Sequence, residues 1–497
     1  MGNAILALDQ GTTGSTALVF AHDGAILSRA YSEFTQHYPQ PGWVEHDPEE
    51  IWQVSERVMI EALDRAGVGP RDLKAIGLTN QRETTIVWDR ETGRPVHPAI
   101  VWQSRQTAPI CEALKRDGLE MTFRESTGLV VDAYFSGTKI KWILDRYPDA
   151  RAKAADGRVL FGTVDTWLLW KMTGGAVHAT DPTNASRTLV YNIHDRAWDA
   201  QLLTLLDVPR AMLPTVLPSS GIFGTTCGDG RLPGGIPIAG IAGDQQAALY
   251  GQGCWTPGLV KNTYGTGCFV LMHMGAKSPI STNGLLTTIC CDPSGGPAYA
   301  LEGSVFVAGA AVQWLRDELA LIGHASETEA IAASIPDAGG VYLVPAFVGL
   351  GAPYWDMNAR GALVGLTRGS GRAQIVRATL ESLAYQTRDV IELMNRDAGV
   401  AVTELRVDGG ASANNFLMQF QADLIGVPVD RPMVIETTAT GAAFLAGLGA
   451  GFWRSPDEVA SVRRRERLFE PRMAEATRAR LYKGWKKAVL QVQVGTE

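Results

Sequence analysis

Residues 4–16 read AILALDQGTTGST and combine an apolar run with a turn of small polar residues. The apolar run at residues 5–8 predicts a buried strand, which ends on the lone carboxylate of Asp9. The turn that follows contains only Gln, Gly, Thr and Ser. Glycine lets a main chain approach a ligand closely, while N–H groups and hydroxyls bind phosphate oxygens. The stretch therefore predicts a phosphate site, with Asp9 placed to hold Mg²⁺ beside it, although Asp9 alone is equally compatible with an Asx turn.

Two further turns resemble this one. Residues 260–270 read VKNTYGTGCFV and residues 407–415 read VDGGASANN, each with a strand that runs into a glycine-rich turn. Any one of them is most simply an ordinary turn, because Gly and Asn populate turns everywhere. Three of them, each after a strand, favour a duplicated fold that holds a nucleotide between its halves. The Gly- and Pro-containing segment 251–258 is the predicted break, so we expect domains at residues 1–250 and 251–497.

Strand-like and helix-like segments alternate along the chain, which predicts an α/β fold with mixed sheets flanked by helices. Amphipathic helices are expected at residues 48–66 and 372–394. Strands are expected at residues 5–8, 75–79, 84–88, 99–102, 236–243, 341–347 and 404–410.

Composition excludes several classes of protein. The 497 residues are 45% hydrophobic and 20% charged, which is a globular balance, and the length calls for more than one domain. A net charge of -7 argues against a nucleic-acid partner. Six cysteines without a C-x-x-C pair predict neither zinc nor a disulfide framework, so we expect a reducing, cytoplasmic location. No run of about 18 apolar residues occurs, so no membrane insertion is expected.

Familiar nucleotide-binding and catalytic motifs are absent from the sequence. There is no Walker A loop, no protein-kinase catalytic loop, no dinucleotide-binding fingerprint and no hydrolase nucleophile elbow. The sequence therefore does not support any of these four classes.

A second carboxylate follows an apolar strand in residues 240–251, GIAGDQQAALYG. Asp244 precedes a helix-like segment, where an N-cap is the simplest explanation. The neighbouring Gln245 and the nearby YGTGC turn favour a catalytic role instead. A carboxylate close to a transferred phosphoryl group can accept the proton of the attacking hydroxyl.

A third polar group, TNQRETTIVW, places Arg82 beside Glu83 at residues 79–88. Neighbours on a strand point to opposite faces, so both reach one ligand only from an irregular loop. A surface ion pair is the plainer interpretation. Together, the donors of Arg and the acceptors of Glu suit an uncharged polyol. Aromatic walls for its CH groups are expected from Trp102, Tyr134 and Phe269.

Long blocks of the sequence resemble the glycerol kinases of the FGGY carbohydrate kinase family. They include DQGTTGST, NQRETTIVW, GIAGDQQAALYG, KNTYGTGCF and GLGAPYWD, and both signature regions, at residues 134–145 and 361–381. The likeness runs from about residue 4 almost to the end of the chain. It implies two actin/hexokinase-like (ribonuclease H-like) ATPase domains with the active site in the cleft between them. It also implies MgATP-dependent phosphorylation of glycerol to sn-glycerol 3-phosphate.

The same resemblance implies a role for individual residues. Asp244 corresponds to the general base and, with Asp9, to the Mg²⁺-linked carboxylates. Glycerol-binding positions are Arg82, Glu83, Trp102, Tyr134, Asp244, Gln245 and Phe269. Contacts to ATP are implied for Thr12, Thr13, Gly14, Thr266, Gly309, Gln313, Gly410 and Asn414.

The first loop departs from the family pattern. It often reads GTTSSR in relatives and reads GTTGST here, so Gly14 replaces a Ser and Thr16 stands where an Arg is common. Two alternatives stay open: a kinase of xylulose, gluconate or erythritol, and a non-catalytic actin-like ATP-binding switch. A homodimer or homotetramer is expected.

Overall fold

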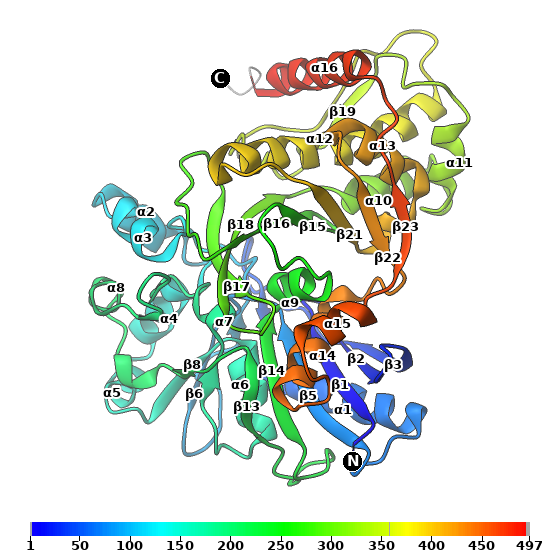
Figure 1. The fold of residues 1–497 in the computed structure, drawn as a ribbon. Helices are drawn as coiled ribbons and strands as arrows, with labels where there is room; N and C mark the ends of the chain where they lie inside the picture. Colours follow the sequence, from blue (N-terminus) through cyan, green and yellow to red (C-terminus); the bar gives the residue numbers. More distant parts are fainter. Residues whose placement is uncertain (1, 357, 494–497) are drawn as a thin grey trace.

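Two large mixed sheets, one above the other in Figure 1, form the framework of the molecule. The computed structural model describes residues 2–356 and 358–493. The lower sheet has six strands in the order β13 (Ser220–Thr225), β14 (Pro237–Gly243), β5 (Leu73–Asn80), β1 (Ala4–Gln10), β2 (Gly14–Ala21) and β3 (Ile26–Glu33). The upper sheet has seven in the order β17 (Leu286–Cys291), β18 (Pro297–Val305), β16 (Cys268–Gly275), β15 (Leu259–Tyr264), β21 (Glu404–Asp408), β22 (Val429–Pro432) and β23 (Arg465–Phe469).

The two sheets repeat one topology. In the lower sheet β1 pairs antiparallel with β2 and parallel with β5, which in turn pairs parallel with β14. In the upper sheet β15 pairs antiparallel with β16 and parallel with β21, which pairs parallel with β22. The turns after β1 and β15 are therefore equivalent hairpins, whereas the turn at 407–415 leaves a strand equivalent to β5. The predicted α/β fold with a duplicated mixed sheet is confirmed.

Helices and small sheets complete each half. The lower half contains α1 (Pro48–Ala66), α2 (Ala108–Arg116), α3 (Glu120–Thr127), α4 (Ser136–Arg146), α5 (Pro148–Ala155), α6 (Val164–Met172), α7 (Pro182–Ala185), α8 (Ala200–Leu206) and α9 (Asp244–Gly251). The upper half contains α10 (Gly309–Asp317), α11 (Glu327–Ala333), α12 (Arg372–Ala398), α13 (Asn415–Ile425) and α16 (Glu475–Gln493). Two further helices from late in the chain, α14 (Thr437–Gly449) and α15 (Pro456–Val462), lie against the lower sheet (Figure 1). The small two-stranded sheets pair β4 (Glu45–His46) with β7 (Ala99–Ile100), β6 (Ile86–Asp89) with β8 (Val159–Gly162), β9 (Ala179–Thr180) with β12 (Thr215–Val216), β10 (Tyr191–Asn192) with β11 (Ala197–Trp198), and β19 (Tyr342–Val344) with β20 (Ala362–Val364).

The two halves interlock through α9 and α14. Helix α14 comes late in the chain, yet it packs on β1, β5 and β14 of the lower sheet, and it also packs on α9. Its small residues share one hydrophobic core with the lower sheet. A Cβ at Gly441 would collide with the main chain of Ala247 in α9, so the close approach of the two helices requires glycine there.

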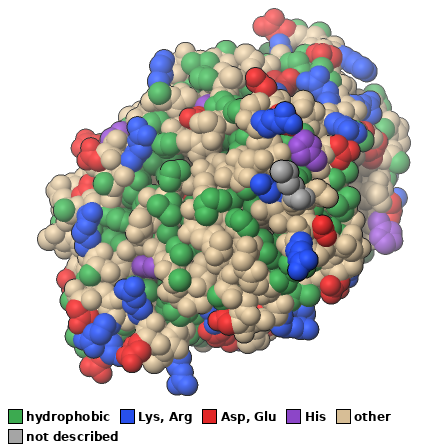
Figure 2. Space-filling model, turned by 60° about the horizontal axis from the view of Figure 1, so that its bottom comes forward, with side chains coloured by type: hydrophobic (Ala, Val, Ile, Leu, Met, Phe, Trp, Pro, Cys, Tyr) green, Lys and Arg blue, Asp and Glu red, His purple; other side chains and the backbone are tan. Residues whose placement is uncertain are grey.

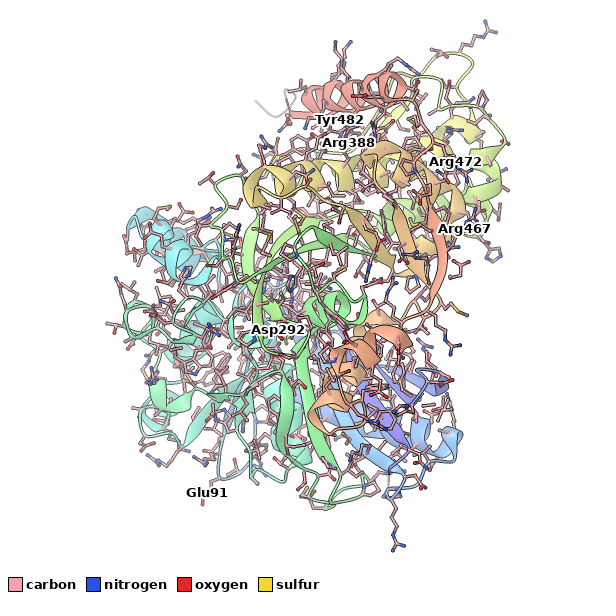
Figure 3. The ribbon with its side chains drawn as sticks, viewed as in Figure 1. Glu91, Asp292, Arg388, Arg467, Arg472 and Tyr482 are labelled. Atoms are coloured by element: carbon pink, nitrogen blue, oxygen red, sulfur yellow. The ribbon has the colours of Figure 1, made fainter. Side chains whose placement is uncertain are left out.

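In the upper half, α16 packs against α12. Arg388 on α12 lies under the ring of Tyr482 on α16, with the guanidinium carbon 3.8 Å from the ring centroid, which fixes α16 on α12 (Figure 3). On the face seen in Figure 2, basic and acidic side chains are interspersed around the rim. Within residues 2–356 and 358–493, no helix is long and apolar enough to cross a membrane.

The predicted elements appear with some differences in length. The helix expected at residues 48–66 is α1, which begins after its N-cap Asp47 and ends at Gly67, whose φ is 64°. The strand expected at 341–347 is confined to β19, because Pro345 cannot donate a ladder hydrogen bond. Residues 81–85 form a loop between β5 and β6, and Glu83 has a φ of 60°. The irregular backbone expected around Arg82 and Glu83 is thus confirmed.

Candidate active site

The first phosphate turn is a tight hairpin between β1 and β2. Asp9 lies near the end of β1, opposite Thr16 of β2, and the N–H of Gly11 donates to the carbonyl of Gly14 at 2.9 Å. Thr13 at the tip is exposed. Gly14 is buried, and a Cβ there would lie 2.6 Å from the carbonyl oxygen of Ser32, so packing against β3 explains this glycine.

Side chains from other segments hold this hairpin in place. The amide of Gln36 donates to the carbonyl of Thr12 at 3.0 Å, and its oxygen lies 2.7 Å from Nε2 of His46. The amide of Gln81 donates to the side-chain oxygen of Gln10 at 3.2 Å. The indole N–H of Trp102 donates to Oγ1 of Thr12 at 2.8 Å. The loop is therefore fixed before any ligand arrives.

Asp244 is the first residue of α9, and Gly243 is its N-cap. The carboxylate accepts from the N–H of Gln245 at 2.7 Å and forms an ion pair with Nε of Arg82 at 3.1 Å. Its side chain is 30% exposed, so one side is open to a ligand. The alternative of an N-cap does not apply, because Gly243 is the N-cap and the carboxylate lies one position inside the helix.

Arg82 is the centre of a buried polar cage, which we define as Arg82, Glu83, Tyr134, Asp244 and Gln245. Its Nη2 donates to the hydroxyl of Tyr134 at 3.3 Å, and its Nε lies 3.7 Å from Oε1 of Glu83. Side-chain groups on α4 fix the turn at Glu83: the carbonyl of Glu83 accepts from Oγ of Ser136 at 3.0 Å and from Nζ of Lys139 at 3.1 Å. Burial lowers the pKa of Lys139 to about 7, although Glu83 and Asp132 oppose the shift.

Two charged residues that the sequence did not reveal complete this cage. Glu302 on β18 accepts from Nη1 of Arg82 at 2.6 Å and from Nη2 of Arg187 at 2.9 Å. Arg187 also donates from Nε to Oε1 of Glu83 at 2.6 Å. Burial alone would raise the pKa of Glu302, but Arg187 and Arg82 hold it at about 2. The sequence feature that could have revealed Glu302 is its place as a single acidic residue in the apolar run 299–307, YALEGSVFV.

Aromatic rings cover the cage on one side. The rings of Trp102 and Tyr134 are 5.6 Å apart between centroids, and those of Trp102 and Phe269 are 6.4 Å apart. Phe269 belongs to β16 of the upper sheet, whereas the other two come from the lower half. Hydrogen bonds, ion pairs and ring contacts thus join all seven positions predicted to bind a polyol into one group.

Asp9 and Asp244 are the two carboxylates predicted to hold Mg²⁺. Burial, with a smaller contribution from the charge of Asp244, raises the pKa of Asp9 to about 7. Thr79, the β5 neighbour of Asp9, has a buried hydroxyl without a hydrogen-bond partner in the described structure. Among the described residues, no group of three or more His, Cys, Asp or Glu could hold a metal. A cation bound by few protein ligands and by phosphates is the pattern typical of Mg²⁺.

The other five residues predicted to contact ATP lie on the upper half: Thr266, Gly309, Gln313, Gly410 and Asn414. Thr266 is exposed at the β15–β16 hairpin, and its carbonyl accepts from the N–H of Ala308 at 2.8 Å. Gly309 begins α10 against this hairpin, and a Cβ there would lie 2.6 Å from the carbonyl oxygen of Gly265. Gln313 and Gly410 are exposed, on α10 and after β21.

Asn414 has a structural function in this part of the chain. Its side chain accepts from the N–H of Leu417 at 3.0 Å and caps α13, while its amide donates to Thr328 at 3.1 Å. No hydrogen bond within residues 2–356 and 358–493 joins Gln313, Gly410 or Asn414 to the polar cage. Their predicted contacts to nucleotide stay predictions.

Comparisons with known proteins agree with this architecture. Residues 4–251 match the N-terminal domain, and residues 260–450 the C-terminal domain, of the FGGY family of carbohydrate kinases. The chain is 61% identical over 485 residues to "Glycerol kinase 2" of Thermotoga maritima, covering 98% of both chains. It is 62% identical over 485 residues to the glycerol kinase of Halorhodospira halophila, covering 98% of this chain and 96% of the relative. The crystal structure of Plasmodium falciparum glycerol kinase with ADP is 35% identical, with a TM-score of 0.92, over 99% of this chain and 98% of that one. The chain therefore belongs to the FGGY family of carbohydrate kinases.

Proposed function

We propose that this chain transfers the γ-phosphoryl group of MgATP to glycerol, giving sn-glycerol 3-phosphate and ADP. The observation that carries the proposal is the polar cage joined to its aromatic wall, a site built for a small uncharged polyol. Relatives at about 60% identity over nearly the whole chain are named glycerol kinases, which supports the same substrate.

The cage residues offer donors and acceptors to different hydroxyl groups of glycerol. Arg82 and Gln245 offer N–H donors to glycerol hydroxyls, and Glu83 and Asp244 offer carboxylate acceptors. Oε1 of Glu83 accepts a hydrogen bond from Arg187, so Oε2 of Glu83 is the oxygen that we propose for the substrate. Tyr134, Trp102 and Phe269 contact the CH groups. The Arg82–Glu83 pair and these aromatic walls favour a three-carbon polyol over xylulose, gluconate and erythritol.

Asp244 is the proposed general base. It accepts the proton of a terminal hydroxyl as that oxygen bonds to the γ-phosphorus, while the bond from phosphorus to the β,γ-bridging oxygen breaks and ADP leaves. The transition state of such transfers is loose, so positioning and charge stabilisation supply most of the rate. Arg82 orients Asp244 through the ion pair at 3.1 Å.

The remaining predicted residues serve the nucleotide. Thr12, Thr13, Gly14 and Thr266 are the proposed phosphate contacts, and Gly309, Gln313, Gly410 and Asn414 the proposed contacts to the rest of ATP. Asp9 and Asp244 would hold Mg²⁺, which would neutralise charge on the β- and γ-phosphates. A cytoplasmic location and a homodimer or homotetramer stay predictions.

A substrate panel tests the proposal. Purified protein is assayed for ADP release with glycerol, xylulose, gluconate and erythritol, and the phosphorylated product is identified. We expect the highest kcat/KM with glycerol. A higher kcat/KM with another polyol would contradict the proposed substrate, and ATP turnover that ignores every polyol would favour an actin-like switch.

A further inference from the structure

Four charged side chains form a closed set of ion pairs, which we call the buried quartet: Arg82 and Glu83 of the cage, together with Arg187 and Glu302. Each is at most 2% exposed. Glu302 binds both arginines, with Arg82 Nη1 at 2.6 Å and Arg187 Nη2 at 2.9 Å, and Arg187 Nε binds Glu83 at 2.6 Å. Water cannot screen charges at this depth, so each one is felt strongly by a bound ligand.

The buried quartet contains equal numbers of guanidinium groups and carboxylates. The arginines hold the pKa of Glu302 at about 2, so Glu302 stays ionised at neutral pH. Burial raises the pKa of Glu83 above its usual value, and Arg82 and Arg187 oppose that shift. On the ligand side of the cage, Asp244 adds a carboxylate that pairs with Arg82. The fully buried Lys261 also contacts the cage: its Nζ donates to Oγ1 of Thr263 at 2.8 Å and to the side-chain oxygen of Gln245. Lys139 donates to the main chain at Glu83 and Tyr134.

We infer that Glu302 and Arg187 are specificity-determining residues: by completing the buried quartet, they make the cage select an uncharged three-carbon polyol over charged analogues. Neither residue is placed to contact glycerol. Each acts through Arg82 or Glu83 by setting the electrostatic potential at the ligand. The inference rests on the proposed function, because it takes glycerol as the ligand of the cage.

Glu302 also ties the ligand site to the other half of the molecule. It lies on β18 of the upper sheet, whereas Arg82 and Arg187 belong to the lower half. The buried quartet therefore exists only when the two halves are in contact. The set of charges that we infer to select the ligand is therefore complete only when the two halves are in contact.

Charged analogues of glycerol test this inference directly. Glycerate carries a carboxylate in place of one hydroxymethyl group, and 3-amino-1,2-propanediol carries an ammonium in place of one hydroxyl. For each protein the measured quantity is the inhibition constant of the analogue divided by KM for glycerol. Glu302→Gln removes one negative charge, so this ratio for glycerate should fall at least ~10-fold, since unscreened charges a few ångströms apart interact strongly. Arg187→Gln removes one positive charge, so the ratio for the amine should fall by a similar factor.

Two controls separate charge from structural damage. Glu302→Asp keeps the charge and should keep the wild-type glycerate ratio, even if KM for glycerol rises. Glu381→Gln removes a buried carboxylate from a different ion pair, with Arg377 at 2.8 Å on α12, and should leave both ratios unchanged. A variant that is only destabilised loses active protein without a change in either ratio.

The outcomes are distinguishable. An unchanged glycerate ratio in folded Glu302→Gln overturns the inference, and if that variant does not fold, an unchanged amine ratio in Arg187→Gln does so. Failure of wild-type protein to phosphorylate glycerol, seen first in the substrate panel, overturns the proposed function instead. In either case, calorimetric titration of glycerol into wild-type protein shows whether the protein binds glycerol.

Discussion

At the scale of single residues, Asp244 combines an open side with a fixed orientation. One carboxylate oxygen is held by Arg82 and by the N–H of Gln245, and the other accepts from the amide of Gln245 at 3.1 Å. Asp244→Asn keeps the shape and loses the basic oxygen. We expect kcat for glycerol to fall roughly 10²–10⁴-fold, the usual contribution of a general base. Steady-state kinetics at saturating MgATP measure this change.

Asp292 provides the matched control for that substitution. It lies in the turn between β17 and β18, near the middle of the view in Figure 3, where it accepts from the N–H groups of Ser294 and Gly296. Asp292→Asn should retain kcat. If Asp244→Asn keeps a kcat close to that of Asp292→Asn, Asp244 is not the base.

The sequence reveals some of these residues and conceals others for a physical reason. Arg82 and Glu83 are adjacent and follow a strand, so a local pattern was enough to single them out. Arg187 binds groups 104 and 115 residues away, and neither partner lies near it in the sequence. A buried charge is recognisable from its apolar surroundings, as at Glu302, but its partner is set only by the tertiary fold.

At the scale of elements, the short strand β4 connects the phosphate hairpin to the interior. His46 on β4 is fully buried, with its ring 4.9 Å from that of Phe34 and Nε2 2.7 Å from Gln36, which holds Thr12. Burial lowers the pKa of His46 to about 3, and His37 adds to the effect. The folded protein therefore keeps this imidazole neutral in the range where an unfolded chain protonates it.

The consequence is a loss of stability in acid. Between pH 6.5, the usual pKa of histidine, and pH 3 the unfolded state binds more protons than the folded state, so the free energy of unfolding falls as pH falls. For this one group the loss between pH 7.5 and pH 5 is about 2 kcal/mol. Urea denaturation at the two pH values should show a pH effect about 2 kcal/mol smaller in His46→Asn than in wild type.

A surface histidine is the control for His46. His324 is exposed beside α11, and His324→Asn should retain the full pH effect of the wild-type protein. An equal pH effect in His46→Asn and His324→Asn would show that His46 is not the group responsible.

Elements differ in how well the sequence predicts them. Helix α1 was predicted over its full length, because a capping Asp, an amphipathic pattern and a terminal Gly all lie within it or beside it. The association of α14 with the lower sheet was not predictable. Its residues are small and apolar all around, and such a pattern says that the helix is buried without saying against which half.

At the scale of the whole molecule, the contacts between halves lie beside the ligand site. Helices α9 and α14 pack together there, and Glu302 reaches Arg82 across the same boundary. Thr13 and Thr266, the proposed phosphate contacts, belong to opposite halves and are both exposed. A γ-phosphate bound by both hairpins would draw the halves together around the joint made by α9 and α14.

Domain closure is therefore the expected response to both substrates. Closure would exclude water, which otherwise competes with glycerol for the phosphoryl group. Small-angle scattering should show a smaller radius of gyration with glycerol plus a non-hydrolysable ATP analogue than with either ligand alone. Asp244→Asn should close in the same way, because the change removes a base and leaves the hairpins intact. An unchanged radius with both ligands bound would mean that the site excludes water without a large motion, and that the two hairpins already lie at their catalytic separation.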